Sequence, residues 1–482
     1  MSNVKKNFLY SAGFQVINMV VPLFTMPYIT RVIGANGIGM YSYAMSVASY
    51  FSLFILLGLN NYGSRTIAAV RNDKKILSCT FIEIYIFQLF CGFLVLLCYF
   101  VYLLLFCKNV SLALVFIIHI LSVVLDITWF FNGLEQFRLL AVRNTVIKIL
   151  TMGLIFIFIK DEGDLLKYCM ILTGGTLFAS VYFWVYVKGI IEWVRPSVKG
   201  IVQHIKPNLT LFITVLVISL YKILDKIMLG LMSSYDQVGF FEITEKVTNI
   251  PMSFISAFGL VMLPHISNKL SLNNTNSERT TYLSILFVMF MSTSMPFGIM
   301  AVSREFVPFF FGQGYNECIK LFLIILPSCL FLGFANVLRT QYLIPLKMDS
   351  IYIKSTSLGA LVNVVLNVML IPFYGAVGAS VSTLAAEIAV CAYQAFKLRL
   401  LLPITKYVRD SIPFVLSGVC MFLIVYWCPA MFDNALSTII IKICIGVLFY
   451  SISMITICYI YRDRYVILND YLKRILAPSI KL

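Results

Sequence analysis

The sequence predicts an all-α polytopic membrane protein with about fourteen transmembrane helices, built as two pseudo-symmetric six-helix lobes plus two C-terminal helices. Three observations predict this class. Hydrophobic residues make up 60% of the 482 residues and charged residues only 12%, which leaves little of the chain polar enough for a soluble domain. The apolar residues occur in runs of about 20, the length of a helix that crosses a bilayer. Lysine and arginine gather in alternate loops between these runs, as in multi-pass membrane proteins.

Six apolar runs predict the first lobe, residues 1–187. They are 8–30, 40–60, 78–104, 111–131, 139–159 and 165–187. Backbone polar groups in lipid need internal partners, and runs this long and uniformly apolar provide them as helices rather than as barrel strands. Lys5 and Lys6 precede the first run as in a signal peptide, but no small-residue cleavage site follows, which favours a retained first helix.

Six further runs predict the second lobe, residues 207–396. They are 207–231, 238–263, 281–302, 318–338, 355–373 and 376–396. The polar stretch 188–206 is predicted to be a cytosolic linker between the lobes. Runs at 412–430 and 437–460 predict two extra helices within 412–460, followed by a basic cytosolic tail, 461–482.

The positive residues predict how the chain is oriented. Most lysines and arginines lie at the N-terminus, in the loops after even-numbered runs, and in the tail, whereas the opposite side has only Arg31, Lys108, Lys160 and Arg304. Positive loops stay in the cytosol, so both termini are expected there. The net charge of +16 therefore indicates topology, and nucleic acid is not an expected partner.

The sequence does not predict a metal site or a cofactor, and it does not predict that the protein is an enzyme. The twelve cysteines include no C-x-x-C pair and mostly lie in apolar runs, where buried structural thiols are expected. His119, His204 and His265 are too far apart for a zinc motif. We find no phosphate-binding loop of an ATPase and no strong catalytic dyad.

A weak internal repeat relates the two predicted lobes. Residues 38–41 (Ile-Gly-Met-Tyr) correspond to residues 238–241 (Val-Gly-Phe-Phe), 200 positions later, and residues 376–380 echo them again. Glycine at a hairpin permits a tight turn and close helix packing, although glycine–apolar pairs also recur by chance. Because each of the first two segments begins the second helix of a six-helix block, we favour paired parallel repeats, a plan common in transporters.

Several lysines lie within or beside the predicted spans, where an unpaired charge costs about 3 kcal/mol or more. Lys167, Lys320 and Lys442 are near helix ends and are expected to extend toward the membrane surface. Lys148 is about 14 Å from the cytosolic end of its span at 1.5 Å per residue. It is predicted to face a wet cavity or to pair with a group on another helix such as Asp126.

Two charged stripes are predicted on neighbouring spans. Lys222, Asp225 and Lys226 share one helix face, and Glu242, Glu245 and Lys246 form the second stripe. A self-neutralising ionic network and a ligand site are both compatible with these six charges. Glu387 is a candidate protonation site, because burial disfavours the charged form, or else a carboxyl hydrogen-bonded within the bundle. Asn363 and Asn367 are expected to hydrogen-bond across helices, a packing role that we favour over substrate contact.

The chain resembles the bacterial polysaccharide flippases, the O-antigen or capsule repeat-unit branch of the superfamily that also contains multidrug extruders and the lipid II flippase. The segments that carry this resemblance run in order from the first span to the twelfth. They are RVIGANGIGMY (31–41), NYGSR (61–65), DITWFFNGLE (126–135), DKIMLG (225–230) with QVGFF (237–241), and the stretch from Asn363 through Gly378 to Glu387.

This resemblance implies two lobes around a central cavity that opens alternately to each side of the bacterial inner membrane. The implied substrate is an oligosaccharide repeat unit on polyprenyl pyrophosphate, moved from the cytosolic to the outer leaflet, with polymerase and chain-length machinery as further partners. Cationic substrate-binding candidates are the basic residues Arg31, Arg65, Lys148, Lys222 and Lys226. Ion-coupling candidates are the acidic residues Asp126, Asp225 and Glu387.

Two other functions compete with this interpretation. A cation-coupled drug extruder of the same superfamily would favour acidic and aromatic cavity residues, and Lys148 argues against it. A membrane-embedded polysaccharide polymerase would need a sizeable loop or domain to hold the sugar and a base, whereas the predicted outer loops are short. A purely structural scaffold would leave Lys148 and the charged stripes without a role.

Overall fold

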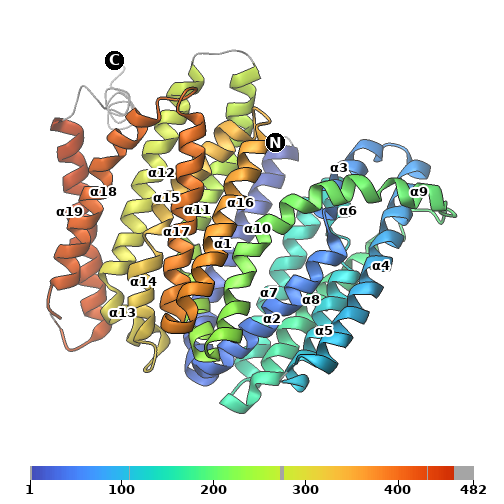
Figure 1. Ribbon diagram of the computed structural model, residues 1–482, viewed down its shortest axis with the longest axis horizontal. Helices are drawn as coiled ribbons and strands as arrows, with labels where there is room; N and C mark the ends of the chain where they lie inside the picture. The colour runs from blue at the N-terminus through green and yellow to red at the C-terminus, as the bar shows by residue number, and fades with distance from the viewer. Residues whose placement is uncertain (1–2, 108, 272–275, 431, 461–482) are drawn as a thin grey trace, which may run out of the picture. The chain divides into compact units, whose positions relative to one another are not determined.

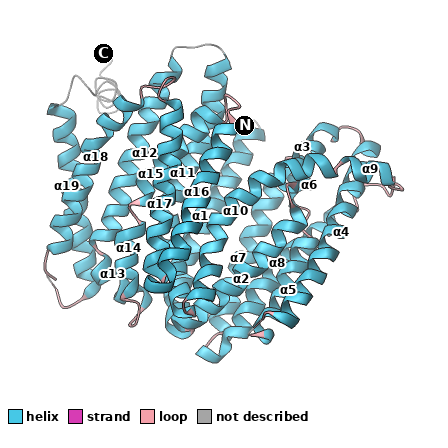
Figure 2. Cartoon of the chain, viewed as in Figure 1, coloured by secondary structure: helices cyan, strands magenta, loops and turns pink. Residues whose placement is uncertain are grey.

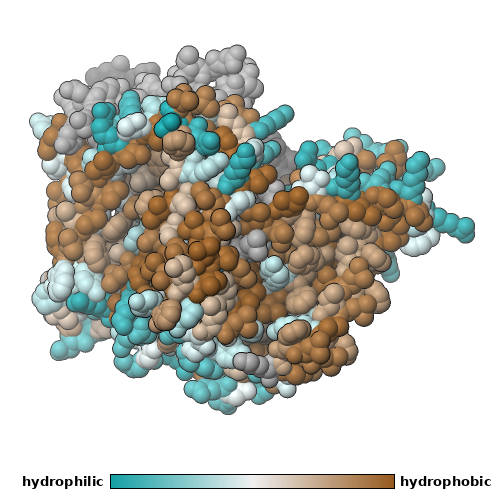
Figure 3. Space-filling model, in the orientation of Figure 1, coloured by the Kyte–Doolittle hydropathy of each residue, from teal (hydrophilic) through white to brown (hydrophobic). Residues whose placement is uncertain are grey.

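The computed structural model describes residues 3–107, 109–271, 276–430 and 432–460. Within these ranges every regular element is a helix (Figure 1, Figure 2), which confirms the predicted all-α class. Twelve helical segments of the described chain are long and apolar enough to cross a membrane. The other two predicted spans, 8–30 and 238–263, are also helical. On the face drawn in Figure 3, apolar side chains cover the middle of the helices and hydrophilic ones gather toward their ends.

Contacts divide the chain into an N-terminal unit, Met1–Glu242, and a C-terminal unit, Ile243–Leu482. The N-terminal unit contains α1 (Asn3–Val32), α2 (Gly34–Leu56), α3 (Leu59–Val70), α4 (Lys74–Leu105), α5 (Val110–Val124), α6 (Thr128–Gly133), α7 (Phe137–Phe158), η1 (Glu162–Asp164), α8 (Leu165–Val187), α9 (Val198–Gln203) and α10 (Ile205–Met232). Its last residues begin α11 (Tyr235–Ser271). The predicted linker 188–206 contains α9, which packs against α4 and α10.

The C-terminal unit contains the rest of α11 and eight further α-helices of the described chain. They are α12 (Asn276–Ala301), α13 (Ser303–Phe311), α14 (Glu317–Ile325), α15 (Ser328–Leu338), α16 (Asp349–Tyr374), α17 (Ala376–Leu398), α18 (Ile404–Trp427) and α19 (Ala435–Ile460), with a π-helical turn, η2 (Arg339–Leu343), after α15. The helices α16 and α17 form an antiparallel hairpin that turns at Gly375, whose φ of 54° suits glycine. The lobe boundaries expected from the sequence stay a prediction.

Span 111–131 is not one continuous helix. Its helical structure is interrupted between the end of α5 at Val124 and the start of α6 at Thr128. The amide of Gln88 on α4 donates to the carbonyls of Val123, Val124 and Asp126, at 2.9–3.1 Å. Its own oxygen accepts from the indole of Trp129 at 2.9 Å. A break inside a membrane helix is tolerated where side chains satisfy the freed backbone groups. One buried glutamine therefore makes this irregularity possible.

Arg143 lies in α7 and is buried, with 8% of its surface exposed. Its guanidinium stands 3.8 Å from the centre of the Phe183 ring and donates to the carbonyl of Ala179 at 3.0 Å. Stacking on an aromatic face and bonding to a backbone carbonyl make burial of this charge acceptable.

Lys442 also departs from expectation, because its side chain does not extend to the membrane surface. It is 1% exposed in α19 and its ammonium lies 2.6 Å from Glu305 Oε1 on α13. Lys167 and Lys320 keep exposed side chains, each paired with a carboxylate three residues before it. The expectation of an extended side chain was wrong for Lys442 because its partner comes from a different helix.

Replacing Lys442 with alanine is expected to lower the free energy of unfolding by about 3–5 kcal/mol, because the largely buried Glu305, 18% exposed, would be left without its cation. Thermal unfolding of the purified protein in detergent measures this loss. Lys320→Ala is the matched control, since it removes an exposed pair and should cost about 1 kcal/mol or less. Equal shifts for the two variants would contradict a stabilising role for the buried pair.

Candidate substrate-binding and coupling residues

The two glycines of the sequence repeat touch each other in the N-terminal unit. A Cβ atom on Gly39 of α2 would overlap the carbonyl oxygen of Tyr235 and lie 3.0 Å from the nitrogen of Gly239. A Cβ atom on Gly239 of α11 would likewise overlap the carbonyl oxygen of Ala35. Only glycine allows two helix backbones to approach this closely. We call this contact the Gly39–Gly239 crossing.

Hydrogen bonds on both sides of the crossing join residues that are 200 positions apart. The amide of Asn36 donates to the Asp236 carboxylate at 3.0 Å, and the Ser42 hydroxyl donates to Glu242 Oε2 at 2.8 Å. Together with Gly39 and Gly239, these contacts place corresponding residues of the two repeat segments against each other. The 200-residue correspondence seen in the sequence therefore describes a physical contact between α2 and α11.

The charged stripes meet near the same crossing. The Lys226 ammonium of α10 lies 2.6 Å from Glu242 Oε2 of α11, the same oxygen that accepts from Ser42. Asp225 is buried beside Lys226, and Glu245 and Lys246 also have interaction partners. One ion pair, Lys226–Glu242, thus joins α10 to α11. The side chain of Lys222 lies outside the described residues, and a substrate-binding role for Lys226 stays a prediction.

Lys148 lies in α7, half-buried, and its ammonium has no hydrogen-bond or ion-pair partner in the described part of the chain. The predicted pair with Asp126 is not formed. Asp126 Oδ1 instead accepts from the backbone nitrogen of Thr128 at 3.0 Å and from its hydroxyl. That arrangement places a carboxylate at the start of α6, where free backbone N–H groups favour it. Lys148 therefore differs from Lys226 and Lys442, which both have carboxylate partners.

The two candidate arginines are exposed and lie on other helices. Arg31 is in the last turn of α1, where Nη1 contacts the carbonyl of Pro27 at 3.5 Å. Arg65 is on α3, and among the described residues it has no ion-pair partner. The structure thus places the candidates Arg31, Arg65 and Lys148 on three helices of the N-terminal unit, and their common role in substrate binding stays a prediction.

Glu387 is buried in α17, with 5% of its surface exposed. On the adjacent α16, the Asn367 amide donates to Asn363 Oδ1 at 3.1 Å. The asparagines therefore bond to each other along one helix. The use of Glu387, Asp225 or Asp126 for ion coupling stays a prediction.

A second buried titratable cluster was missed by the sequence interpretation. His204 Nδ1 and the Tyr62 hydroxyl are 2.6 Å apart, and His204 Nε2 lies 3.6 Å from Glu83 Oε2. The Ser197 hydroxyl also donates to Glu83 at 3.4 Å. We had considered His204 only as a zinc ligand, whereas Glu83, an acidic residue inside the apolar run 78–104, was the signal that could have found the cluster.

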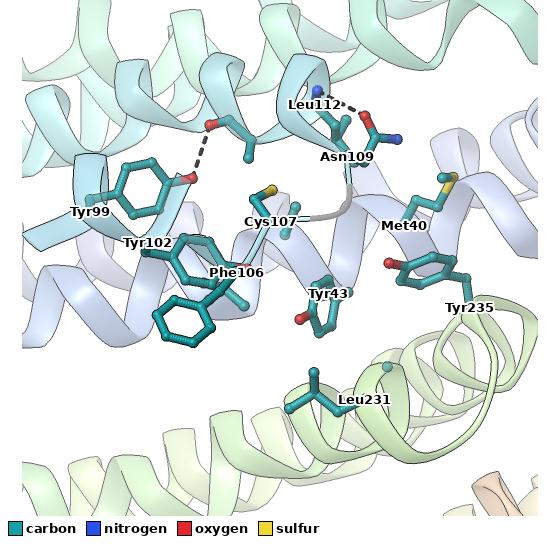
Figure 4. A pocket seen from close by; sticks show the side chains of 14 residues that line it. Met40, Tyr43, Tyr99, Tyr102, Phe106, Cys107, Asn109, Leu112, Leu231 and Tyr235 are labelled. Atoms are coloured by element: carbon teal, nitrogen blue, oxygen red, sulfur yellow. Dashed lines mark hydrogen bonds between the residues drawn. The ribbon is translucent and has the colours of Figure 1, made fainter. Parts of the chain in front are cut away.

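A pocket of the N-terminal unit opens where α4 ends and α5 begins, with about 580 Å³ of space including its mouth. Figure 4 shows its aromatic walls: Tyr99 and Tyr102 come from α4, Phe106 directly follows that helix, Tyr43 comes from α2 and Tyr235 from α11. None of the described residues that line it is charged. The sequence did not reveal it, because its tyrosines come from three separate helices.

Solved structures share this fold over nearly the whole chain. The lipid II flippase MurJ, in an inward closed conformation, aligns with a TM-score of 0.69 at 17% identity, covering 94% of this chain and 99% of that one. A multidrug resistance MATE family transporter in an inward-facing conformation aligns with a TM-score of 0.57 at 13% identity, covering 81% and 99%. The protein is thus a multi-pass membrane protein with the fold of this transporter superfamily.

Sequence comparison identifies the family within that class. A family model described as polysaccharide biosynthesis protein matches residues 4–270, and the chain belongs to that family. A proposed O-antigen transporter of Escherichia coli (strain K12) is 22% identical over 391 residues, 80% of this chain and 94% of that protein. A proposed low-salt glycan biosynthesis flippase of Haloferax volcanii is 29% identical over 164 residues, 34% of each chain. The family resemblance stated from the motifs is therefore confirmed.

Proposed function

We propose that this protein moves oligosaccharide repeat units, carried on polyprenyl pyrophosphate, from the cytosolic to the outer leaflet by alternating access. The observation that carries the proposal is Lys148, a half-buried ammonium in a membrane helix with no partner among the described residues. Such a charge is costly in the membrane. A pyrophosphate would supply the missing anion, and lysine binds phosphate as a point charge.

The names of the relatives support a lipid-linked glycan as cargo. Two of them are proposed O-antigen transporters, one is a proposed glycan biosynthesis flippase, and the MurJ structure is that of a lipid II flippase. In our proposal the pyrophosphate binds the basic residues, the sugars occupy a wet cavity, and the polyprenyl tail stays in lipid.

We further propose that both termini face the cytosol of a bacterial inner membrane, as the loop charges indicate. The released repeat unit would then pass to polymerase and chain-length machinery in the outer leaflet. A drug extruder of the same fold is the rival function, and Lys148 argues against it because a positively charged cavity repels cationic drugs.

Deletion of the gene in its host tests this proposal. We expect single lipid-linked repeat units to accumulate on the cytosolic leaflet, where a membrane-impermeant glycan-oxidising reagent cannot modify them in intact cells. Accumulation of units that the reagent does modify would indicate a polymerase or ligase instead. Unchanged glycolipid together with altered drug sensitivity would favour the extruder.

A further inference from the structure

The pocket at the end of α4 has walls of a kind that suits one class of ligand. The Tyr99 and Tyr102 rings lie 5.7 Å apart between centroids, and the Tyr43 and Tyr235 rings meet edge to face, 5.6 Å between centroids. Tyr99 is fixed by its hydrogen bond to the carbonyl of Ala113, at 2.9 Å. These contacts hold four aromatic side chains in place around the pocket (Figure 4), which reduces the entropy cost of binding.

Two polar groups at the pocket remain available to a ligand. The Tyr235 hydroxyl has no hydrogen-bond partner in the part of the chain that the structure describes. Asn109 uses its side-chain oxygen to accept from the nitrogen of Leu112 at 3.2 Å, which leaves its NH₂ group free at the mouth. A hydrocarbon chain would leave these donors unpaired, and unpaired polar groups disfavour binding.

The described residues that line the pocket are uncharged, and five of them are aromatic. A sugar ring presents an apolar C–H face and a rim of hydroxyls. Aromatic faces combined with a few hydrogen-bonding groups match both features.

We infer that this pocket, which we call the tyrosine pocket, binds a sugar residue of the transported oligosaccharide. The inference rests on the proposed function and adds a saccharide subsite separate from the basic residues. Two lining residues of the tyrosine pocket also border the helix crossing. Met40 follows Gly39 in the sequence, and the carbonyl oxygen of Tyr235 contacts Gly39. A bound sugar therefore contacts the two helices that meet at that crossing.

Thiol labelling of the full-length protein tests the inference without a destabilising substitution. Cys107 is a free, half-buried thiol that lines the tyrosine pocket, and Cys428 is a free, half-buried thiol outside it. The probe ligand is the repeat-unit oligosaccharide released by mild acid from the host's own lipid-linked pool. At about ten times its Kd it should slow maleimide labelling of Cys107 about tenfold and leave Cys428 unchanged, as read by peptide mass spectrometry.

Two variants test whether the protection of Cys107 from maleimide comes from a sugar bound in the tyrosine pocket. Tyr102→Ala should abolish protection of Cys107, whereas Tyr374→Ala, which changes an exposed tyrosine at the end of α16, should retain it. Unprotected Cys107 at saturating oligosaccharide would overturn the inference, as would protection by a polyprenyl phosphate lacking sugars. If Cys107 is not protected but cells translocate normally, only the saccharide subsite is wrong. If Cys107 is protected but cells do not translocate the repeat unit, the result counts against the proposed function.

Discussion

Lys148→Ala is expected to reduce translocation of lipid-linked repeat units by about 10- to 100-fold, the loss that follows from removing a charged contact worth about 1.5–3 kcal/mol. The physical reason is that the half-buried Lys148 ammonium has no protein partner among the described residues and is therefore available to an anionic substrate. The measurement is the fraction of glycolipid accessible from outside the cell, with the amount of protein in the membrane determined in parallel.

Lys320→Ala is the control for this variant, because Lys320 is exposed and already paired with Glu317 at 3.1 Å. It should translocate normally. Lys148→Arg keeps the charge and should retain part of the activity, although a guanidinium has a different shape. Wild-type translocation by Lys148→Ala at normal abundance would remove this residue from the binding site.

Gly39→Ala is expected to destabilise the protein by about 3 kcal/mol or more, at the upper end of the cost of overpacking. The added methyl group would overlap the carbonyl oxygen of Tyr235, and backbone atoms cannot move aside as a flexible side chain can. We therefore expect a lower midpoint of thermal unfolding in detergent. We also expect a loss of translocation, because α2 and α11 can no longer approach each other closely at the Gly39–Gly239 crossing.

Gly153→Ala provides the matched control, since it also lies within a membrane helix but a Cβ atom there meets nothing within 4 Å. Alanine is the better helix former by about 1 kcal/mol, so this variant should be as stable as the wild type or more so. If Gly39→Ala behaved in the same way, the close approach of α2 and α11 would not be required.

The positions of the helices could be predicted from the sequence because the bilayer imposes one strong requirement. A run of about 20 apolar residues is long enough to span and must be helical, so every predicted span is a helix or a pair of helices. The break between α5 and α6 could not be predicted, since it depends on Gln88 from α4 satisfying three carbonyls of another segment. Hydropathy does not record such tertiary partners.

The same limit separates what could be predicted of the site from what could not. The repeat pointed to Gly39 and Gly239, because a correspondence between segments 200 residues apart can be found by comparing the sequence with itself. Lys442 was misplaced because its partner, Glu305, is 137 positions away. The tyrosine pocket was invisible, since residues from separate helices converge only in the folded chain. Patterns in the sequence therefore identified individual charged residues, whereas their interaction partners on other helices became known only from the structure.

Translocation by the purified protein in sealed vesicles tests the central claim most directly. Vesicles would carry lipid-linked repeat units, and a membrane-impermeant glycan-oxidising reagent would count those in the outer leaflet. We predict that the wild type moves the inner units outward until the reagent reaches them, whereas Lys148→Ala and protein-free vesicles leave them protected. Wild-type protein that leaves the inner units protected, under an ion gradient of either direction, would contradict the account.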